Sequence, residues 1–277
     1  MSGCLYIVGT PIGNLNDISK RALETLNIVD FIIAEDCRVT LKLLNKYKIK
    51  KPLFSHHKFS SLKTANLIVN KILNGESAAI VSDAGMPLIC DPGETIVNLC
   101  YEKGINVTVV PGPSALISAL SLSGLSCKRF TFFGFLSTKK TSRINSLMFL
   151  KNIPHTLIFY EAPHKLVRTL KDFLKYFNDC KIIIIKEITK IHESVQKFTI
   201  SEAIKFYESQ NSIKGEFVLI VEKNNETSQK QYTLKDAVTI AKNLMLHGEK
   251  ASDAAKKAAK ITNFKKSYIY KHILNTN

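Results

Sequence analysis

The sequence predicts an α/β protein with two α/β domains and a small helical module at its C-terminal end. Short runs of uncharged, β-branched residues alternate with amphipathic stretches through most of the chain, and this pattern restarts near residue 124. A polar segment, residues 224–231, then precedes a stretch with helical periodicity only. The 277 residues suit about two domains, and the hydrophobic content of 45% is typical of folded proteins.

The first predicted domain, residues 1–123, has apolar strands separated by amphipathic helices. Because its strands are apolar throughout rather than alternating, we expect a mainly parallel sheet covered on both faces. Gly124 is expected to end the last helix. The predicted strands are 5–8, 31–34, 78–81 and 107–110, and the predicted helices are 17–29, 39–47, 64–73, 94–103 and 114–123.

The second predicted domain, residues 124–225, has a mixed sheet. Two of its strands, 194–200 and 216–222, alternate in the way that antiparallel strands do. The other predicted strands are 130–133, 156–160 and 181–186, and the predicted helices are 142–150, 164–177 and 201–207.

The C-terminal module, residues 232–277, is predicted to hold helices at 234–246, 252–261 and 266–274. Ser252 and Asp253 are candidate N-terminal caps, and residues 262–264 suit a tight turn. The last two helices with that turn resemble a helix-turn-helix, although three helices of this size also suit a dimerisation module.

Positive charge is concentrated in this module. Residues 226–277 hold 10 Lys and 4 acidic residues, a net charge of +6, within a whole-chain charge of +16. Such a density favours contact with phosphates of nucleic acid. An A/T-rich genome or a solvated helix face would also account for it.

The cysteines and the first residues bear on the compartment. The six cysteines are scattered and form no C-x-x-C pair, which argues against zinc and against a disulfide framework. The first cationic side chain is Lys20, so a signal peptide is not expected. We expect a reduced, soluble, cytoplasmic protein that does not enter the membrane.

Loops rich in Gly, Pro and small polar residues follow several of the predicted strands. Ligands of parallel sheets bind at the carboxyl ends of strands, where such loops meet. Neither the dinucleotide fingerprint nor a P-loop occurs. Seen singly, each loop could be a tight turn or a helix N-terminus. The loops are 9–15, 34–40, 82–93, 111–115, 160–165 and 215–217.

Together and in this order, these loops resemble the tetrapyrrole-methylase superfamily of S-adenosylmethionine-dependent methyltransferases. They are most similar to the branch that methylates a cytidine 2′-hydroxyl in 16S rRNA. At two positions the sequence differs from the pattern of this superfamily: Cys37 and Met86 each stand where the resemblance leads us to expect threonine. The segments that carry the resemblance are LYIVGTPIGNL (5–15), AED (34–36), SDAG (82–85), PLI (87–89), DPG (91–93), PGP (111–113), FYE (159–161) and GE (215–216).

The resemblance implies the fold of that superfamily, with S-adenosylmethionine as methyl donor in a cleft between the two α/β domains and no metal. It also implies a homodimer, with 16S rRNA of the 30S subunit as partner of the C-terminal module. The cofactor-binding residues implied by similarity are Pro11, Asp83, Ala84, Gly85, Met86, Ile89, Ser114, Ala115, Tyr160, Glu161, Ala162, Glu216 and Phe217.

A ribose hydroxyl is a weak nucleophile, so a base or a charge-stabilising group should assist methyl transfer. We expect Glu35, Asp36 and Arg38 in this role because three ionisable side chains clustered at the end of a strand suggest a function. Asp83, Glu161 and Glu187 remain alternative bases, with Lys186 as a further electrostatic partner, and Glu161 could instead orient the cofactor.

Two rival functions share these residues. The first is methylation of a small tetrapyrrole, against which the loop 9–15 and the basic C-terminal module argue. The second is a non-enzymatic RNA-binding factor with an inactive methylase fold, against which the intact glycine loops argue.

Overall fold

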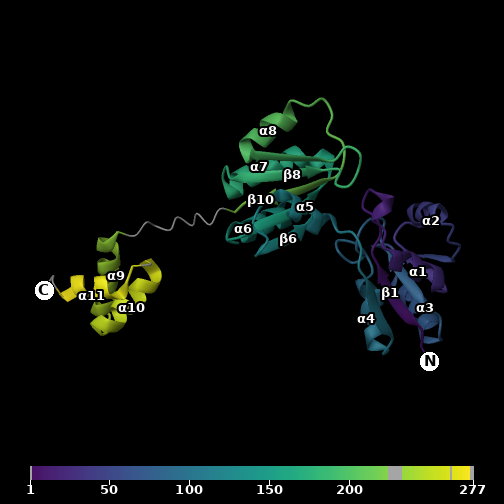
Figure 1. The fold of residues 1–277 in the computed structure, drawn as a ribbon, viewed down its shortest axis with the longest axis horizontal. Helices are drawn as coiled ribbons and strands as arrows, with labels where there is room; N and C mark the ends of the chain where they lie inside the picture. The colour runs from purple at the N-terminus through teal and green to yellow at the C-terminus, as the bar shows by residue number, and fades with distance from the viewer. Residues whose placement is uncertain (1, 224–232, 263, 275–277) are drawn as a thin grey trace. The chain divides into compact units, whose positions relative to one another are not determined.

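The structure is a computed structural model that describes residues 2–223, 233–262 and 264–274. It consists of two compact units, Met1–Lys223 and Asn224–Asn277. The first unit holds two five-stranded sheets and the second unit holds helices, so the predicted fold class is confirmed (Figure 1).

The first sheet is parallel throughout, with the strand order β3-β2-β4-β1-β5. The predicted strands match β1, β2, β4 and β5 within about one residue. β3 was not predicted, because it has three residues at the sheet edge and none of them is fully buried. The strand bounds are Cys4–Val8 for β1, Phe31–Ala34 for β2, Leu53–Ser55 for β3, Ala78–Val81 for β4 and Asn106–Val110 for β5.

Helices cover both faces of this sheet because successive residues of a strand point to opposite sides. Phe31 and Ile33 pack against α3 and α4, whereas Ile32 and Ala34 pack against α1 and α2. The first helix begins later than predicted because Leu15–Asp17 forms a 3-10 turn and Ser19 caps the helix. The helix bounds are Lys20–Ile28 for α1, Cys37–Lys46 for α2, Leu62–Leu73 for α3 and Glu94–Glu102 for α4.

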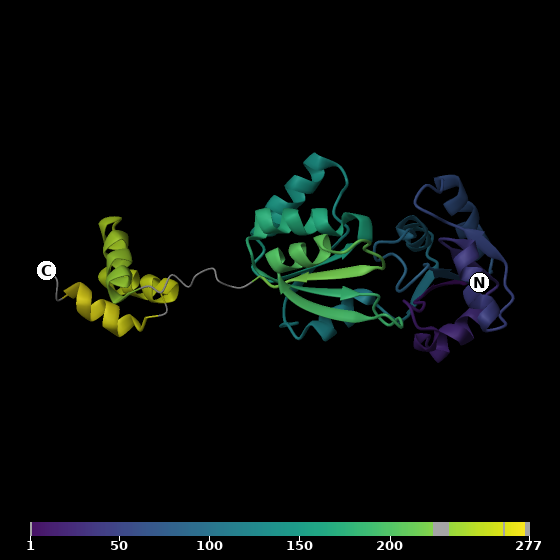
Figure 2. The same ribbon diagram turned by 90° about the horizontal axis from the view of Figure 1, so that it is seen from above.

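The second sheet is mixed, with the order β6-β7-β10-β8-β9. Only β6 and β7 run parallel, and the other neighbours are antiparallel. Figure 2 shows its strands from above with helices on both sides. The strand bounds are Phe130–Gly134 for β6, Thr156–Glu161 for β7, Lys181–Lys186 for β8, Ser194–Thr199 for β9 and Phe217–Val221 for β10.

One helix, α5 (Ala115–Ser123), connects the two sheets. Gly124 ends α5 in the left-handed conformation, as predicted. The predicted boundary after residue 123 assigns α5 to the first domain, yet Ala119 and Leu120 pack against the second sheet. The opposite face of that sheet packs against α6 (Lys140–Lys151), α7 (Leu166–Phe177) and α8 (Ile200–Glu208).

The C-terminal unit is a small bundle of three described helices, α9 (Leu234–Leu246), α10 (Ala251–Thr262) and α11 (Lys266–Leu274). Its buried apolar side chains are five alanines and two isoleucines, which suit close helix packing. Ser252 and Asp253 lie in the first turn of α10, so the predicted cap is wrong. Residues 224–232 and Asn263, where a linker and part of a turn were predicted, lie outside the described residues. Within the described chain, no helix has the length and apolarity that a membrane span requires.

Candidate active site

The loops after β1 and β4 are joined at the carboxyl edge of the first sheet. The Thr10 N–H donates to the Gly85 carbonyl at 2.9 Å, and the Gly85 N–H donates to the Thr10 carbonyl at 3.2 Å. The Thr10 hydroxyl also donates to the Ser82 carbonyl at 3.2 Å. These bonds bring Pro11 and the predicted cofactor segment 83–86 into one region of the molecule.

Glycines allow the loop after β5 to join the same group. A Cβ placed on Gly9 would lie 2.7 Å from the Gly112 Cα and 2.6 Å from the Met86 Sδ. No side chain fits at such distances, so the backbone of the loop after β1 rests directly on the Pro-Gly-Pro loop. Gly85 has a φ of +90°, which favours glycine.

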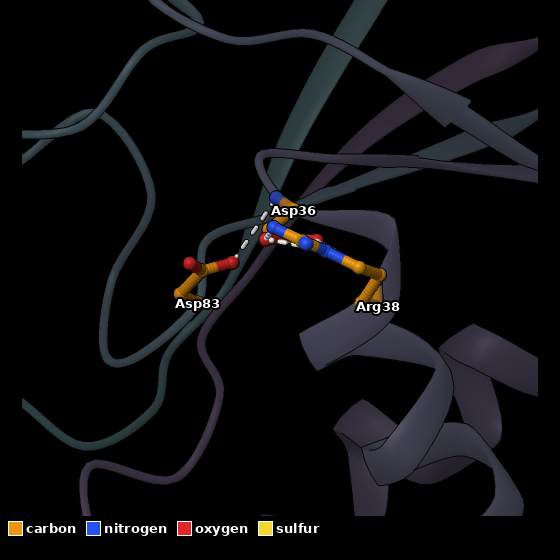
Figure 3. Close-up of polar contacts among 3 residues, drawn as sticks. All are labelled: Asp36, Arg38 and Asp83. Atoms are coloured by element: carbon orange, nitrogen blue, oxygen red, sulfur yellow. Dashed lines mark hydrogen bonds and ion pairs between the residues drawn. The ribbon is translucent and has the colours of Figure 1, made fainter.

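The predicted catalytic residues Glu35, Asp36 and Arg38 follow β2 in the chain. Figure 3 shows Asp36 and Arg38 beside Asp83, which belongs to the loop after β4. Asp36 caps α2 by accepting the Arg38 N–H at 2.8 Å, and its Oδ2 accepts a hydrogen bond from the Arg38 Nη2 at 2.6 Å. The Asp36 N–H donates to Asp83 Oδ1 at 3.1 Å. The structure therefore assembles Glu35, Asp36, Arg38 and Asp83 at adjacent strand ends.

The carboxyl groups of this cluster differ in basicity. Hydrogen bonds from Arg38 lower the pKa of Asp36 to about 2. Burial raises the pKa of Glu35, and the negative charge of Asp83 raises it further. Burial likewise raises the pKa of Asp83. Because a general base must accept a proton near neutral pH, Glu35 is better suited to that role than Asp36.

Asp91 is a fourth carboxylate, to which the sequence analysis gave no role. Burial and, second, the charge of Glu35 raise its pKa to about 6, although a hydrogen bond with the Ser82 side chain opposes the shift. Leu88 and Cys90 both have a φ of +71°, so the loop bends sharply before Asp91. The motif Asp-Pro-Gly was noticed in the sequence, but its approach to Glu35 depends on this bend.

The second sheet reaches the site through Tyr160 at the end of β7. Its hydroxyl accepts the Leu116 N–H at 3.0 Å, which holds the start of α5 beside β7. The Phe132 and Phe135 rings pack edge-on against the Tyr160 ring at centroid distances of 4.9 and 5.7 Å. Tyr160 is thus close to the predicted segment 114–115.

Two predicted cofactor residues turn their side chains away from this face. Glu161 is 4% exposed, and its carboxylate accepts hydrogen bonds from the Thr169 hydroxyl and the Ala162 N–H. Phe217, its partner in the neighbouring strand, packs in the core on the same side. Only the backbone of these two residues is available to a ligand. The Glu161 carboxylate is therefore not placed to act as a base.

Glu216 belongs to a charged group that the sequence analysis recognised only in part. The Lys190 ammonium contacts Glu187 Oε1 at 2.9 Å and Glu216 Oε2 at 2.8 Å, and Glu187 Oε1 also accepts the Glu216 N–H at 2.8 Å. A Cβ on Gly13 would lie 2.5 Å from the Lys190 Cγ. This group therefore packs against the loop after β1. The sequence contained no signal for Lys190 because its contacts with Glu216 and with the loop at Gly13 join segments that are distant in sequence.

Two other residues named in the sequence analysis, Ile89 and Lys186, make no contact described above. Ile89 is 47% exposed in the loop that carries Asp91. Lys186 ends β8, next to Glu187. A cavity of about 410 Å³ lies at the other end of the second sheet, where Lys181 and Thr199 line it, and none of the predicted site residues is among its lining.

The fold and the site define a class of protein. The chain matches the family of tetrapyrrole (corrin/porphyrin) methylases over residues 4–204, and it belongs to that family. Among solved structures, it is similar to uroporphyrin-III C-methyltransferase from Thermus thermophilus, with a TM-score of 0.55 and 18% identity over 82% of this chain and 98% of that chain. Diphthine synthase gives a TM-score of 0.61 and 15% identity over 80% and 90% of the two chains. These structures show the shared fold.

Sequence relatives are more specific. The chain is 46% identical to ribosomal RNA small subunit methyltransferase I of Thermotoga maritima, over 79% of this chain and 98% of that protein. It is 43% identical to the protein of the same name in Xylella fastidiosa, over 97% and 98%. The chain is an S-adenosylmethionine-dependent methyltransferase, which confirms the predicted enzyme class and cofactor.

The residues at the site fit this cofactor. Ser114 gives α5 no side-chain cap. The Leu116 N–H donates to the Tyr160 hydroxyl, and the N–H groups beside it at the start of α5 suit the carboxylate of the methionine moiety. The carboxylates Asp83 and Asp91 suit its positive charge. When bound, S-adenosylmethionine supplies an activated methyl group. The chain's own residues would orient the methyl acceptor.

Proposed function

We propose that this methyltransferase methylates the 2′-hydroxyl of a cytidine in 16S rRNA. The observation that carries the proposal is the 38–46% identity, mostly over nearly the whole chain, to proteins named ribosomal RNA small subunit methyltransferase I. The basic C-terminal unit supports it, because phosphate neutralisation requires such charge. The proposal includes the 30S subunit as substrate, a cytoplasmic location and a homodimer.

Within this proposal, three domains divide the work: residues 1–123 and 124–225 hold the cofactor, and residues 232–277 contact RNA. Contacts with S-adenosylmethionine come from the loops after β1, β4, β5 and β7 and from the start of β10. These contacts are assigned to Pro11, Asp83, Ala84, Gly85, Met86, Ile89, Ser114, Ala115, Tyr160, Glu161, Ala162, Glu216 and Phe217, with Glu161 and Phe217 contributing backbone only.

The catalytic group has two parts. Glu35 takes the proton of the 2′-hydroxyl, since burial raises its pKa whereas the hydrogen bonds from Arg38 lower the pKa of Asp36. Asp36 and Arg38 form an ion pair in which the Arg38 side chain is 88% exposed, so the guanidinium can meet an RNA phosphate. Holding the hydroxyl in line with the methyl group supplies much of the remaining rate enhancement.

The direct test of the activity compares ribosomal RNA from a deletion strain and its parent by mass spectrometry. We expect one cytidine 2′-O-methyl group of 16S rRNA to disappear in the deletion strain and to return with the wild-type gene. Tritium transfer from S-adenosylmethionine to 30S particles, but not to a precorrin-type macrocycle, would exclude the tetrapyrrole substrate. An unchanged methylation pattern in the deletion strain would contradict the proposal.

A matched pair of variants tests the catalytic assignment. Glu35→Gln should lower single-turnover methylation of 30S subunits by about 100-fold and leave S-adenosylmethionine affinity within twofold of wild type. Asp36→Asn should reduce turnover less, because asparagine still caps α2. Full turnover in Glu35→Gln would remove Glu35 as the base.

The C-terminal unit should contribute affinity rather than chemistry. The Thermotoga maritima relative matches 79% of this chain while 98% of its own length is covered, and the unmatched fifth is about the size of residues 224–277. A chain truncated after Lys223 should bind S-adenosylmethionine normally and methylate 30S subunits poorly, through a raised KM. A KM equal to that of the full chain would exclude an RNA-contacting role.

A further inference from the structure

A chain of four hydrogen-bonded side chains lies beneath the end of β7, and three of them, Arg143, Thr169 and Glu161, are buried. Arg143 of α6 donates from Nε to Asp172 Oδ2 at 2.6 Å and from Nη2 to the Thr169 hydroxyl oxygen at 2.8 Å. The Thr169 hydroxyl donates to Glu161 Oε2. Arg143 and Glu161 are each 4% exposed, and Thr169 is fully buried.

The direction of every bond in this chain is determined by chemistry. A guanidinium only donates and an ionised carboxylate only accepts, so Thr169 must accept from Arg143 and donate to Glu161. The other oxygen of Glu161 accepts the Ala162 N–H at 2.9 Å. The chain therefore ends on a backbone amide in the loop after β7.

Stability alone is a poor explanation for this arrangement. Burying ions has a large desolvation cost, and well-packed apolar residues of similar volume are often as stabilising. The buried core residues of α6, α7 and the second sheet around it are leucine, isoleucine, valine and phenylalanine. What the ions add is a single geometry for the residues at the end of β7.

The opposite face of β7 is fixed at the same point. Tyr160 accepts the Leu116 N–H on the side of α5, while Glu161 is held on the side of α7. Two successive residues of the strand are thus anchored in opposite directions, immediately before Ala162. Such double anchoring suits a loop that must present its backbone accurately to a ligand.

We propose that Arg143 and Thr169 are positioning residues, which act through Glu161 to orient the backbone of residues 160–162 for S-adenosylmethionine. They do not contact the cofactor. The inference rests on the proposed placement of the cofactor at this loop. It assigns a function to the FYE motif: its glutamate shapes the loop from the reverse side of the sheet.

A pair of substitutions at Thr169, made in the full-length protein, tests the role of these hydrogen-bonded side chains. Thr169→Val removes the hydroxyl and keeps the volume, whereas Thr169→Ser keeps the hydroxyl. We expect calorimetry to show about 10-fold weaker S-adenosylmethionine binding for Thr169→Val and binding within twofold of wild type for Thr169→Ser. Single-turnover rates at saturating cofactor should stay within about threefold in both.

Leu170→Ala is the stability control, because Leu170 is fully buried in the same helix and takes no part in the hydrogen bonds. It should lower the thermal midpoint more than Thr169→Val while leaving cofactor affinity within twofold. A loss of affinity that follows the loss of stability across these variants would overturn the proposal. Equal effects of Val and Ser at position 169 would also overturn it.

A double-mutant cycle tests whether Thr169 acts through Glu161. If it does, the double variant Glu161→Gln/Thr169→Val should bind S-adenosylmethionine as tightly as whichever single variant binds it less tightly. Additive losses would contradict the relay. Ala162→Leu separates this inference from the proposed position of the cofactor. If Ala162→Leu leaves S-adenosylmethionine binding unchanged, the cofactor lies elsewhere. If Ala162→Leu weakens binding but Thr169→Val does not, the cofactor lies at this loop and the positioning role of Thr169 is rejected.

Discussion

The two sheets contribute to the candidate site in different ways. In the first sheet, loops are held by backbone contacts: Gly9 rests on Gly112, and Thr10 pairs with Gly85. In the second sheet, loops are held by side chains, among which are the buried Glu161 and the half-buried Lys190. The first arrangement leaves Arg38 at the surface, whereas the second uses charge to shape the backbone.

This difference predicts different responses to substitution. A backbone contact has no space for even one methyl group, so its loss should be abrupt. A contact between side chains should respond in a graded manner, because a conservative replacement retains part of it. The variants below compare the two arrangements.

Gly9→Ala should have the largest effect. Its Cβ would lie 2.7 Å from the Gly112 Cα and 2.8 Å from the Gly112 nitrogen, and neither backbone atom can move without shifting a loop. We expect the free energy of unfolding to fall by about 3 kcal/mol, as for severe overpacking, and S-adenosylmethionine binding to be lost. Urea unfolding and calorimetry measure the two effects.

Gly104→Asn is the matched control for that variant. Gly104 has a φ of +67° with no atom within 4 Å of its added Cβ, and asparagine tolerates this conformation. The control should change stability by less than about 1 kcal/mol and leave binding intact. If Gly9→Ala behaved like the control, the backbone contact would not be what holds these loops together.

The elements of the fold were predictable wherever local sequence determines them. Segments 31–34, 78–81 and 181–186 became strands with those bounds because their consecutive apolar residues are buried on both faces of the sheet. β3 was missed because its stability comes from pairing with β2 rather than from its own three residues. The start of α10 was displaced because Asp253 suits a first turn as well as a cap.

The site was predictable at the level of loops but not of side-chain direction. The sequence identified Glu161 as a candidate base, whereas alternation along β7 and the partner Thr169 turn its carboxylate into the core. Asp91 and Lys190 gained their importance from loops that are distant in sequence. Such contacts depend on tertiary structure, which residue spacing does not encode.

The pH dependence of stability tests the electrostatics of the first sheet. Because the pKa of Asp91 rises from 3.8 to about 6 on folding, the native state binds its proton more tightly, and the free energy of unfolding should fall as pH rises from about 4 to 6. Asp91→Asn should remove this slope and stabilise the protein at pH 7.5 by about 1–3 kcal/mol. Urea midpoints at pH 4 and pH 7.5 measure it, and a wild-type slope in the variant would exclude Asp91 as the source.

The smallest effect is expected at the surface of the second sheet, where two partners of Lys190 differ in exposure. The Glu216 side chain is 79% exposed, so its pair with Lys190 should contribute less than about 0.5 kcal/mol, and Glu216→Gln should leave the thermal midpoint close to that of wild type. The Glu187 side chain is 20% exposed and accepts both the Lys190 ammonium and the Glu216 N–H. Glu187→Gln should therefore lower the thermal midpoint by a few degrees and weaken S-adenosylmethionine binding by about threefold, a graded loss unlike that at Gly9. Calorimetry in low and high salt measures both variants, and equal behaviour of the two would show that burial does not determine the contribution of this charged group.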